Sequence, residues 1–185
     1  MIQSSKNLLR KKILKQRQEL SEEEWQSKSN LICNRLHNSS LFTRANIIFA
    51  YFSFRKEADL TSLFSLNKIW AFPRCVDKSL VWHLWKPGEE LFTDKYGIEI
   101  PSKTSPIVSI TSADLILIPT VACDRQRYRL GYGGGFYDRL LASFKRSEVC
   151  TIGITFDFAL IKQLPIDTWD IKLDYICTET KLTSY

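Results

Sequence analysis

The stretch DLILIP, residues 114–119, is the clearest strand in the chain, because a continuous apolar run closed by proline is typical of a buried strand. After a glycine-rich segment, the stretch FYDRLLASF at 136–144 is typical of a helix. Strands that lead into helices are the repeating unit of α/β proteins, whose strands lie mostly parallel because the helices cross back over the sheet. Residues 114–144 therefore predict an α/β fold.

Strands and helices alternate through most of the chain. A short helix is predicted for ADLTSLFSL at 58–66, and the region 86–113 is predicted to be loop because it is rich in proline and glycine. Further strands are predicted for NIIFAYF at 46–52, KIWAFP at 68–73, LVWHLW at 80–85, CTIGITF at 150–156 and DYICT at 174–178. The alternation predicts a mostly parallel sheet that is covered on both faces.

Two helices are predicted ahead of the first strand. Residues 5–19 carry leucines and isoleucines at helical spacing with cations on the other faces, which is the pattern of an amphipathic helix. Ser21 and Glu24 form a capping-box signature for a second helix that ends near Asn38.

Length and composition predict one globular domain over residues 1–185. The chain is 44% hydrophobic and 25% charged, and it has no apolar run of the roughly 20 residues that span a bilayer. Its five cysteines are scattered and contain no C-x-x-C pair, which argues against a disulfide framework or a zinc site and favours a reduced cytoplasmic location.

The net charge of +6 is concentrated at the N-terminus. Residues 1–17 hold six lysines and arginines and no acid, so the remainder of the chain is close to neutral. A localised basic element suits an anionic ligand. That ligand could be a nucleic acid or the phosphates of a nucleotide.

The segment RLGYGGGFYDR, residues 129–139, has four glycines in five positions. Glycine tolerates positive φ and close approach, so consecutive N–H groups can curl around an anion before a helix. The segment fits neither the P-loop pattern nor G-x-G-x-x-G, because Phe136 stands where the third glycine would be. We expect this segment to bind a phosphate, and the alternative is that it forms only a flexible turn.

Asp138 directly follows this glycine loop, and a carboxylate there would repel phosphate. A divalent cation resolves the conflict, most simply Mg²⁺ that bridges phosphate and carboxylate. The alternative is that Asp138 only interacts with the positive end of the helix dipole. Arg129, at the start of the segment, is suited to neutralise phosphate charge.

These residues resemble a known family, the 5-formyltetrahydrofolate cyclo-ligases (5,10-methenyltetrahydrofolate synthetases), whose signature is R-L-G-x-G-x-G-[FY]-Y-D. Lys6 and Arg10 match the family's N-terminal K-x-x-x-R pair, and EADL at 57–60 resembles its E-[VI]-[DE]-T stretch. LPIDTWDIKLD near the end matches L-P-x-x-x-x-D-x-x-x-D with Asp170 and Asp174. The resemblance covers nearly the whole chain in one order.

The resemblance implies an open three-layer α/β/α fold with a mostly parallel, Rossmann-like sheet and N-terminal helices. It also implies a reaction, the ATP- and Mg²⁺-dependent cyclisation of 5-formyltetrahydrofolate to 5,10-methenyltetrahydrofolate with release of ADP and phosphate. The partners would be ATP and the folate, with or without additional glutamates, and the protein would be a monomer that binds neither membrane nor nucleic acid. Such a reaction depends on alignment and charge neutralisation and needs no enzyme nucleophile.

The resemblance also assigns residues. Arg129 and Tyr137 would act at the reacting groups, Phe52 and Glu57 would bind the folate, and Asp138 and Asp170 would contact Mg²⁺. ATP would be bound by Lys6, Arg10, Arg129, Leu130, Gly131, Tyr132, Gly133, Gly134, Gly135, Phe136 and Tyr137.

The chain departs from the family pattern at several positions. Arg127 stands where the family usually has glycine, Leu60 where it has threonine, and Ala159 where glutamine is expected. Cys123 precedes Asp124 where phenylalanine is common, and Trp169 precedes Asp170 where histidine is usual. Two other functions therefore remain as alternatives: a non-catalytic folate- or nucleotide-binding relative, and a nucleic-acid-binding module that uses the basic helix.

Overall fold

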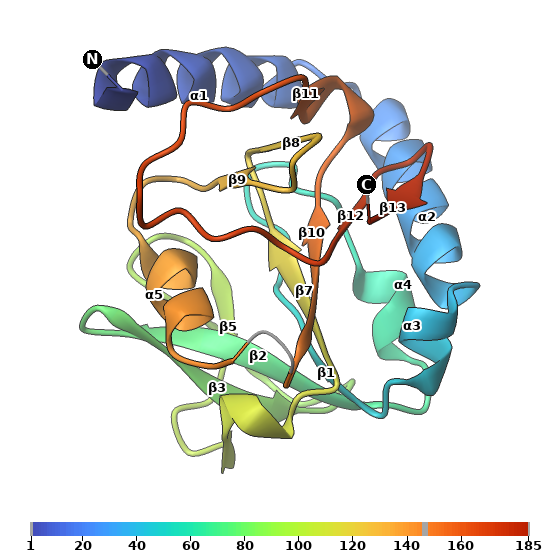
Figure 1. Ribbon diagram of the computed structural model, residues 1–185. Coiled ribbons are helices and arrows are strands. Elements are labelled where there is room, and N and C mark those ends of the chain that lie inside the picture. Colours follow the sequence, from blue (N-terminus) through green and yellow to red (C-terminus); the bar gives the residue numbers. More distant parts are fainter. Residues whose placement is uncertain (1, 146–147, 185) are drawn as a thin grey trace.

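The computed structural model describes residues 2–145 and 148–184, and an eight-stranded sheet forms its centre (Figure 1). The strand order is β13-β12-β10-β7-β1-β2-β3-β6, and the five strands from β12 to β2 are parallel to one another. The strands are β1 (Ile47–Phe49), β2 (Ile69–Val76), β3 (Ser79–Trp85), β6 (Ile107–Val108), β7 (Leu115–Pro119), β10 (Cys150–Ile154), β12 (Tyr175–Cys177) and β13 (Leu182–Thr183). The mostly parallel sheet is confirmed, with antiparallel strands added only at its two edges.

Helices cover both faces of this sheet, which confirms the three-layer α/β/α prediction. Leu115 and Leu117 of β7 pack in a cluster with α2 (Glu22–His37), α3 (Ser40–Arg44) and α4 (Thr61–Phe64). Ile116 and Ile118 face the other way, toward α5 (Phe136–Ala142). Alternate residues of a strand point to opposite faces, so a fully apolar strand needs an apolar cover on each side.

A third cluster docks the N-terminal helix α1 (Ile2–Gln18) onto a small separate sheet (Figure 1). That sheet has the order β11-β8-β9 and contains β8 (Ala122–Asp124), β9 (Arg129–Leu130) and β11 (Leu160–Ile161). Ile13 of α1 is buried among Val121, Leu130 and Leu164, and full burial of such a side chain stabilises by roughly 1.5–3 kcal/mol. The packing holds α1 over the carboxyl ends of β7 and β10.

The helix predictions hold better than the loop predictions. The Ser21 capping box is confirmed, because the Glu24 amide donates to Ser21 Oγ at 3.1 Å and the Ser21 amide donates to Glu24 Oε2 at 2.9 Å. The region 86–113 is more ordered than predicted, since it holds β6, the 3-10 turn η1 (Ile110–Ser112) and the hairpin of β4 (Leu91–Thr93) and β5 (Glu99–Pro101).

Several elements differ from their predicted lengths. The predicted strand 46–52 is regular only over β1, and the predicted helix 58–66 only over α4. The β8–β9 hairpin, α3, β11, β13 and the 3-10 turn η2 (Asp157–Ala159) were not predicted. These elements are short, so tertiary pairing, and not local periodicity, decides whether they form.

The hairpin turn between β8 and β9 explains one departure from the family pattern. Asp124 closes the turn, because its Oδ1 accepts from the amides of Gln126 at 2.9 Å and Tyr128 at 3.0 Å. Arg127 inside this turn has φ of +71°, a conformation that glycine adopts without steric cost. The geometry therefore accounts for a preference for glycine at this position.

Candidate active site

The glycine loop connects β9 to α5 and presents bare backbone. Gly133 and Gly135 have φ of +104° and +68°, which L-residues with side chains rarely adopt. Within 2–145 and 148–184, no residue accepts a hydrogen bond from the amides of 131–135. Unpaired amides that lie together in a loop are suited to bind an anion.

Helix α1 lies against this loop through Arg10. The Arg10 Nε donates to the Gly131 carbonyl at 2.7 Å, and a side chain added at Gly133 would come within 3.6 Å of the Arg10 guanidinium. Burial lowers the pKa of Arg10 from its ordinary value, and the charges of Asp138 and Asp170 oppose that change. Arg10 therefore lies within electrostatic reach of both carboxylates that the sequence assigns to Mg²⁺.

Lys6, one turn before Arg10, is only 6% exposed. Its Nζ donates to Asp167 Oδ2 at 2.7 Å and to Asp170 Oδ2 at 2.5 Å. Burial alone would lower the pKa of Lys6, but the hydrogen bonds that Lys6 donates to the two aspartates raise it above its ordinary value. The loop that carries Asp170 is thereby attached to the start of the chain.

Arg129 and Asp138 form a second ion pair at the two ends of the glycine loop. Arg129 NH2 lies 2.7 Å from Asp138 Oδ1, and a side chain added at Gly131 would come within 2.6 Å of Arg129 NH1. Arg129 is buried, its guanidinium lies 5.4 Å from the centre of the Tyr137 ring, and its Nε has no partner within the described part of the chain. A buried donor without a partner indicates a position that a ligand can satisfy.

The two carboxylates fit a metal ion only together with phosphate. Asp138 is paired with the side chain of Arg129, and Asp170 with that of Lys6. The described residues contain no cluster of three or more side chains that could hold a metal. Mg²⁺ is commonly held by one or two carboxylates together with substrate phosphates and water. The arrangement suits a metal that arrives with a nucleotide.

Glu57 marks a second part of the site. It is 5% exposed, and its Oε2 accepts from the Phe54 amide at 3.1 Å. Burial raises the pKa of Glu57 to about 7, although Arg17, the Phe54 amide and Tyr132 favour the ionised form. The two residues before it, Arg55 and Lys56, have φ of +49° and +54°, and consecutive left-handed residues of this kind store strain.

Arg17 is the site residue that the sequence analysis missed. It is 3% exposed, its Nε donates to the Arg55 carbonyl at 3.0 Å, and its guanidinium donates to the hydroxyl of Tyr132 in the glycine loop. Arg17 thus joins α1, the strained segment before Glu57 and the glycine loop. Its spacing of seven residues from Arg10 places both on one face of the helix, and that spacing was the available signal.

The aromatic residues assigned from the sequence differ in their surroundings. Phe52 is 7% exposed and stacks on Phe72, with ring centres 4.0 Å apart, so its placement favours a role in the core. Tyr137 lies beside Arg129, and burial followed by the charge of Glu57 raises its pKa. Folate contact by Phe52 stays a prediction, whereas Tyr137 lies between the two parts of the site.

Three of the remaining departures from the family pattern lie outside the ion pairs. Leu60 and Ala159 are buried in hydrophobic clusters. Trp169 is 66% exposed, and it lies between the two aspartates that bind Lys6. None of the three replaces a charged group of the site.

A mostly parallel sheet with a glycine loop near its carboxyl ends, bordered by cations and carboxylates, is an arrangement with which α/β proteins bind phosphate. A model of the 5-formyltetrahydrofolate cyclo-ligase family matches residues 2–179. The chain belongs to this family.

Individual relatives agree over most of their length. The 5-formyltetrahydrofolate cyclo-ligase of Escherichia coli K12 is 26% identical over 180 residues, which cover 92% of this chain and 98% of the relative. The solved 5,10-methenyltetrahydrofolate synthetase of Aquifex aeolicus superposes with a TM-score of 0.86 at 32% identity, over 97% of this chain and 92% of that one. The synthetase of Mycoplasma pneumoniae, at 24% identity and a TM-score of 0.74, supports the fold.

Proposed function

We propose that this protein closes the ring of 5-formyltetrahydrofolate to give 5,10-methenyltetrahydrofolate, with conversion of ATP to ADP and phosphate. One observation carries the proposal beyond family membership. The unpaired amides of the glycine loop and the buried carboxylate of Glu57 are joined through Tyr132 and Arg17. A phosphate-binding element and a hydrogen-bond acceptor for a pterin thus belong to one site.

The nucleotide side of the proposal uses the loop and α1. Amides 131–135 bind the phosphates, Lys6 and Arg10 add positive charge, and the unsatisfied Nε of Arg129 donates to a phosphate oxygen. Leu130 lies in β9, just before the loop, and Phe136 is the first residue of α5, just after it. Preformed donors of this kind neutralise the charge that develops during phosphoryl transfer.

Mg²⁺ would be held by Asp138 and Asp170 once ATP supplies its phosphate oxygens. When bound, the ion would neutralise phosphate charge and orient the terminal phosphate. Arg129 and Lys6 are the present partners of these carboxylates, and Lys6 also pairs with Asp167.

The folate side follows from the chemistry of the two substrates. Ionised Glu57 accepts hydrogen bonds from the amino and ring N–H groups of the pterin. The formyl oxygen attacks the terminal phosphorus and ADP leaves. N10 then attacks the activated carbon, and the phosphate leaves with the proton that N10 loses. Arg129 and Tyr137 would act where the formyl group meets the phosphate, and the enzyme would contribute alignment and charge.

The alternative function, nucleic-acid binding by the basic helix α1, receives less support. Lys6, Arg10 and Arg17 direct their charges to the aspartates, the glycine loop and Tyr132. The cations that remain exposed on α1 are Lys11, Lys12 and Lys15.

The described part of the chain has no helix that is both long and apolar enough to cross a membrane. We further propose that the protein acts as a single-domain monomer in a reducing cytoplasm, a location that its free cysteines suit.

The test is the near-ultraviolet absorbance of the methenyl product, measured with purified protein, 5-formyltetrahydrofolate, ATP and Mg²⁺. Wild type forms product, and Asp138→Asn or Arg129→Ala lowers kcat by roughly 100-fold or more, the cost of removing one donor or charge from a preformed site. Asp77→Asn, an exposed turn residue, is the matched control and keeps full activity. Intact folate binding without any product would establish the non-catalytic relative instead.

A further inference from the structure

The turn that leads into Glu57 is held in a strained conformation. Arg55 and Lys56 have φ of +49° and +54°, and the Glu57 amide donates to the Phe54 carbonyl at 3.0 Å, which is the pattern of a type I′ turn. Glycine, asparagine and aspartate favour this turn, because both of its central positions have positive φ. Arginine and lysine do not favour it, so contacts from outside the turn are needed to keep it in place.

Those contacts come from the end of α1 and the start of α2. Arg17 and Gln18 both donate to the Arg55 carbonyl, at 3.0 and 2.6 Å. Lys56 Nζ donates to the Leu20 carbonyl at 2.5 Å, in the connection between the two helices. The corner between α1 and α2 is therefore bonded to both strained residues.

Trp25 of α2 is bonded to Glu57 itself. Its indole Nε1 donates to the Glu57 carbonyl at 2.7 Å, and the Ser53 hydroxyl donates to the same oxygen at 2.8 Å. The carboxylate of Glu57 accepts from the Phe54 amide at 3.1 Å, so the side chain of Glu57 is fixed to the same turn as its main chain. Trp25 thus joins Glu57 directly to a helix.

The sequence around Trp25 fixes the direction of its side chain. Ser21 is the N-cap of α2, so Leu20 and Trp25 are at the N′ and N4 positions, whose apolar side chains commonly pack together. Both side chains pack against the main hydrophobic cluster, and the Trp25 amide donates to the Ser21 carbonyl at 3.0 Å. The apolar part of the indole is therefore held in place while its N–H is presented to Glu57.

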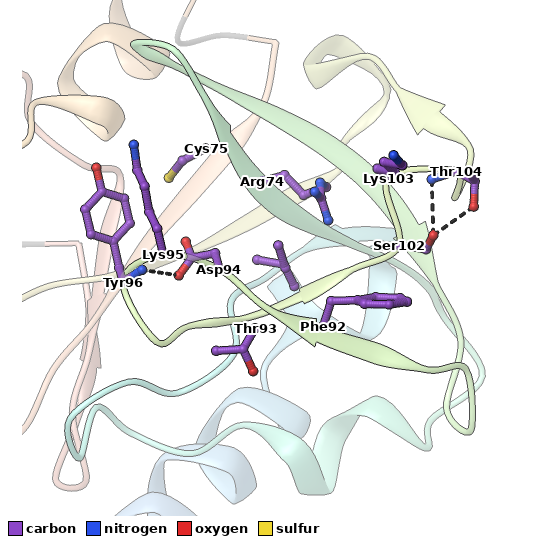
Figure 2. Close-up of a pocket in the computed structure, with 11 residues that line it drawn as sticks. Arg74, Cys75, Phe92, Thr93, Asp94, Lys95, Tyr96, Ser102, Lys103 and Thr104 are labelled. Carbon is purple, nitrogen blue, oxygen red and sulfur yellow. Dashed lines mark hydrogen bonds between the residues drawn. The ribbon is translucent and has the colours of Figure 1, made fainter.

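The β4–β5 hairpin meets the same turn but does not bond to it. A side chain added at Gly97 would lie 3.8 Å from Phe54. The hairpin is closed by hydrogen bonds of its own, such as the one that Asp94 Oδ1 accepts from the Tyr96 amide at 2.8 Å (Figure 2). In the part of the chain that the structure describes, no hydrogen bond joins this hairpin to residues 53–57.

We propose that Trp25 is a positioning residue, which holds the strained turn, and with it the carboxylate of Glu57, in the orientation that binds the pterin. The inference rests on the proposed function, because it concerns the residue that accepts from the folate. The hydrogen bond of Trp25 is on the folate side, whereas Arg17 also reaches the glycine loop through Tyr132. Trp25 therefore affects the binding of folate and not that of the nucleotide.

The first test separates KM from kcat. Trp25→Phe keeps an aromatic ring and removes the N–H, so it raises the KM for 5-formyltetrahydrofolate by roughly five-fold, the effect of one hydrogen bond. The KM for ATP and kcat stay the same, because the pterin is bound equally before and during the reaction. A fall in kcat with an unchanged KM, or an equal rise in both KM values, overturns the proposal.

Trp82→Phe is the matched control. Trp82 is buried and its Nε1 has no partner within the described residues, so this variant loses the same atoms without losing a hydrogen bond. It leaves the KM for the folate unchanged, and the midpoint of urea unfolding checks that each variant is folded. Ser53→Ala removes the second donor to the Glu57 carbonyl and raises the same KM, even if Trp25→Phe does not fold. An equal rise in KM for Trp82→Phe overturns the proposal.

Arg55→Gly tests the part that strain plays. Glycine adopts φ of +49° without steric cost, and its carbonyl still accepts from Arg17 and Gln18. In this background Trp25→Phe raises the KM for the folate by roughly two-fold or less, because relief of the strain offsets the lost hydrogen bond. An equal rise in both backgrounds overturns the role of Trp25 in holding the turn.

The last test needs no turnover. Calorimetric titration with 5-formyltetrahydrofolate in the absence of ATP gives a Kd that is roughly five-fold higher for Trp25→Phe than for wild type. Equal Kd values, while wild type still cyclises the folate, overturn the positioning role. A higher Kd for Trp25→Phe together with no cyclisation by wild type overturns the proposed reaction and leaves the positioning role in place.

Discussion

At the scale of single residues, the site depends on charges that are held in pairs. Lys6 with its two aspartates and Arg129 with Asp138 are ion pairs in which at least one partner is buried. Removal of one partner from such a pair leaves an uncompensated charge, so these pairs fix geometry more than they add stability. Glu57 differs, because burial has the largest effect on its pKa.

Glu57 gives a prediction about pH. Because the pKa of Glu57 is raised to about 7, the carboxylate that accepts from the pterin becomes abundant only as the pH rises through that value. The KM for 5-formyltetrahydrofolate therefore falls between about pH 6 and 8, and Glu57→Gln abolishes this dependence. Steady-state kinetics across that range, with ATP saturating, make the measurement.

Arg17 supplies the control for this prediction. Arg17 lowers the pKa of Glu57, so Arg17→Gln moves the midpoint of the KM profile to higher pH, whereas Arg17→Lys keeps the charge and moves it less. Tyr51, Tyr132 and Tyr137 also interact with Glu57, but burial raises the pKa of all three and keeps them neutral in this range. A midpoint that is the same in wild type and Arg17→Gln would contradict the assignment.

At the scale of elements, the turn between β8 and β9 offers a test of backbone strain. Arg127 at φ +71° is in a conformation that costs a residue with a side chain roughly 1–2 kcal/mol. Arg127→Gly relieves that strain and gives back about 0.5–1 kcal/mol through the freer unfolded chain. The free energy of unfolding therefore rises by up to about 1.5 kcal/mol, seen as a higher midpoint in urea with an unchanged slope.

Arg125→Gly is the matched substitution in the same turn. Arg125 is exposed and is not among the residues with positive φ. The same change there relieves no strain and lowers stability by about 0.5–1 kcal/mol. If both variants lose stability equally, the strain at Arg127 has no energetic consequence.

The sequence was most informative where one element is long and periodic or where a motif is dense. The apolar run 114–119 and the Ser21 capping box predicted a strand and a helix that the structure confirms, because each signal is local. The β4–β5 hairpin and the β8–β9 hairpin were missed, because their strands are only two or three residues long. Pairing between distant segments decides such strands.

The same distinction applies to the site. The glycine loop, Lys6, Arg10 and Asp138 could be assigned from motifs, and the structure brings them together. Arg17 could not, because its importance comes from the Arg55 carbonyl and the Tyr132 hydroxyl, 38 and 115 positions away. The pairing of Asp170 with Lys6 likewise appears only in three dimensions.

At the scale of the whole molecule, the proposed nucleotide site is assembled from three separate regions: α1, the glycine loop and the loop that holds Asp170. A ligand that contacts all three stabilises the folded state by mass action, about 2.7 kcal/mol at 100 times Kd. For a chain of 185 residues this corresponds to a rise in Tm of roughly 5–10 °C. A non-hydrolysable ATP analogue with Mg²⁺ should produce that rise in a thermal unfolding experiment.

Removal of the metal provides the internal control. Chelation of Mg²⁺ reduces the rise in Tm by more than half if Asp138 and Asp170 take part in binding, and Asp138→Asn reduces it in the presence of Mg²⁺. Asp77→Asn keeps the full effect. An equal rise with and without Mg²⁺ would show that the nucleotide binds through the loop and cations alone.

The two ion pairs of Lys6 join positions that are 161 and 164 residues apart. On the ribosome, where about 5–20 residues are added per second, the first helix is made on the order of ten seconds before its aspartates exist. Until then its basic face has no acidic loop to receive it. The proposed ATP-binding region therefore matures last in synthesis, because α1 has to wait for the loop that holds Asp167 and Asp170.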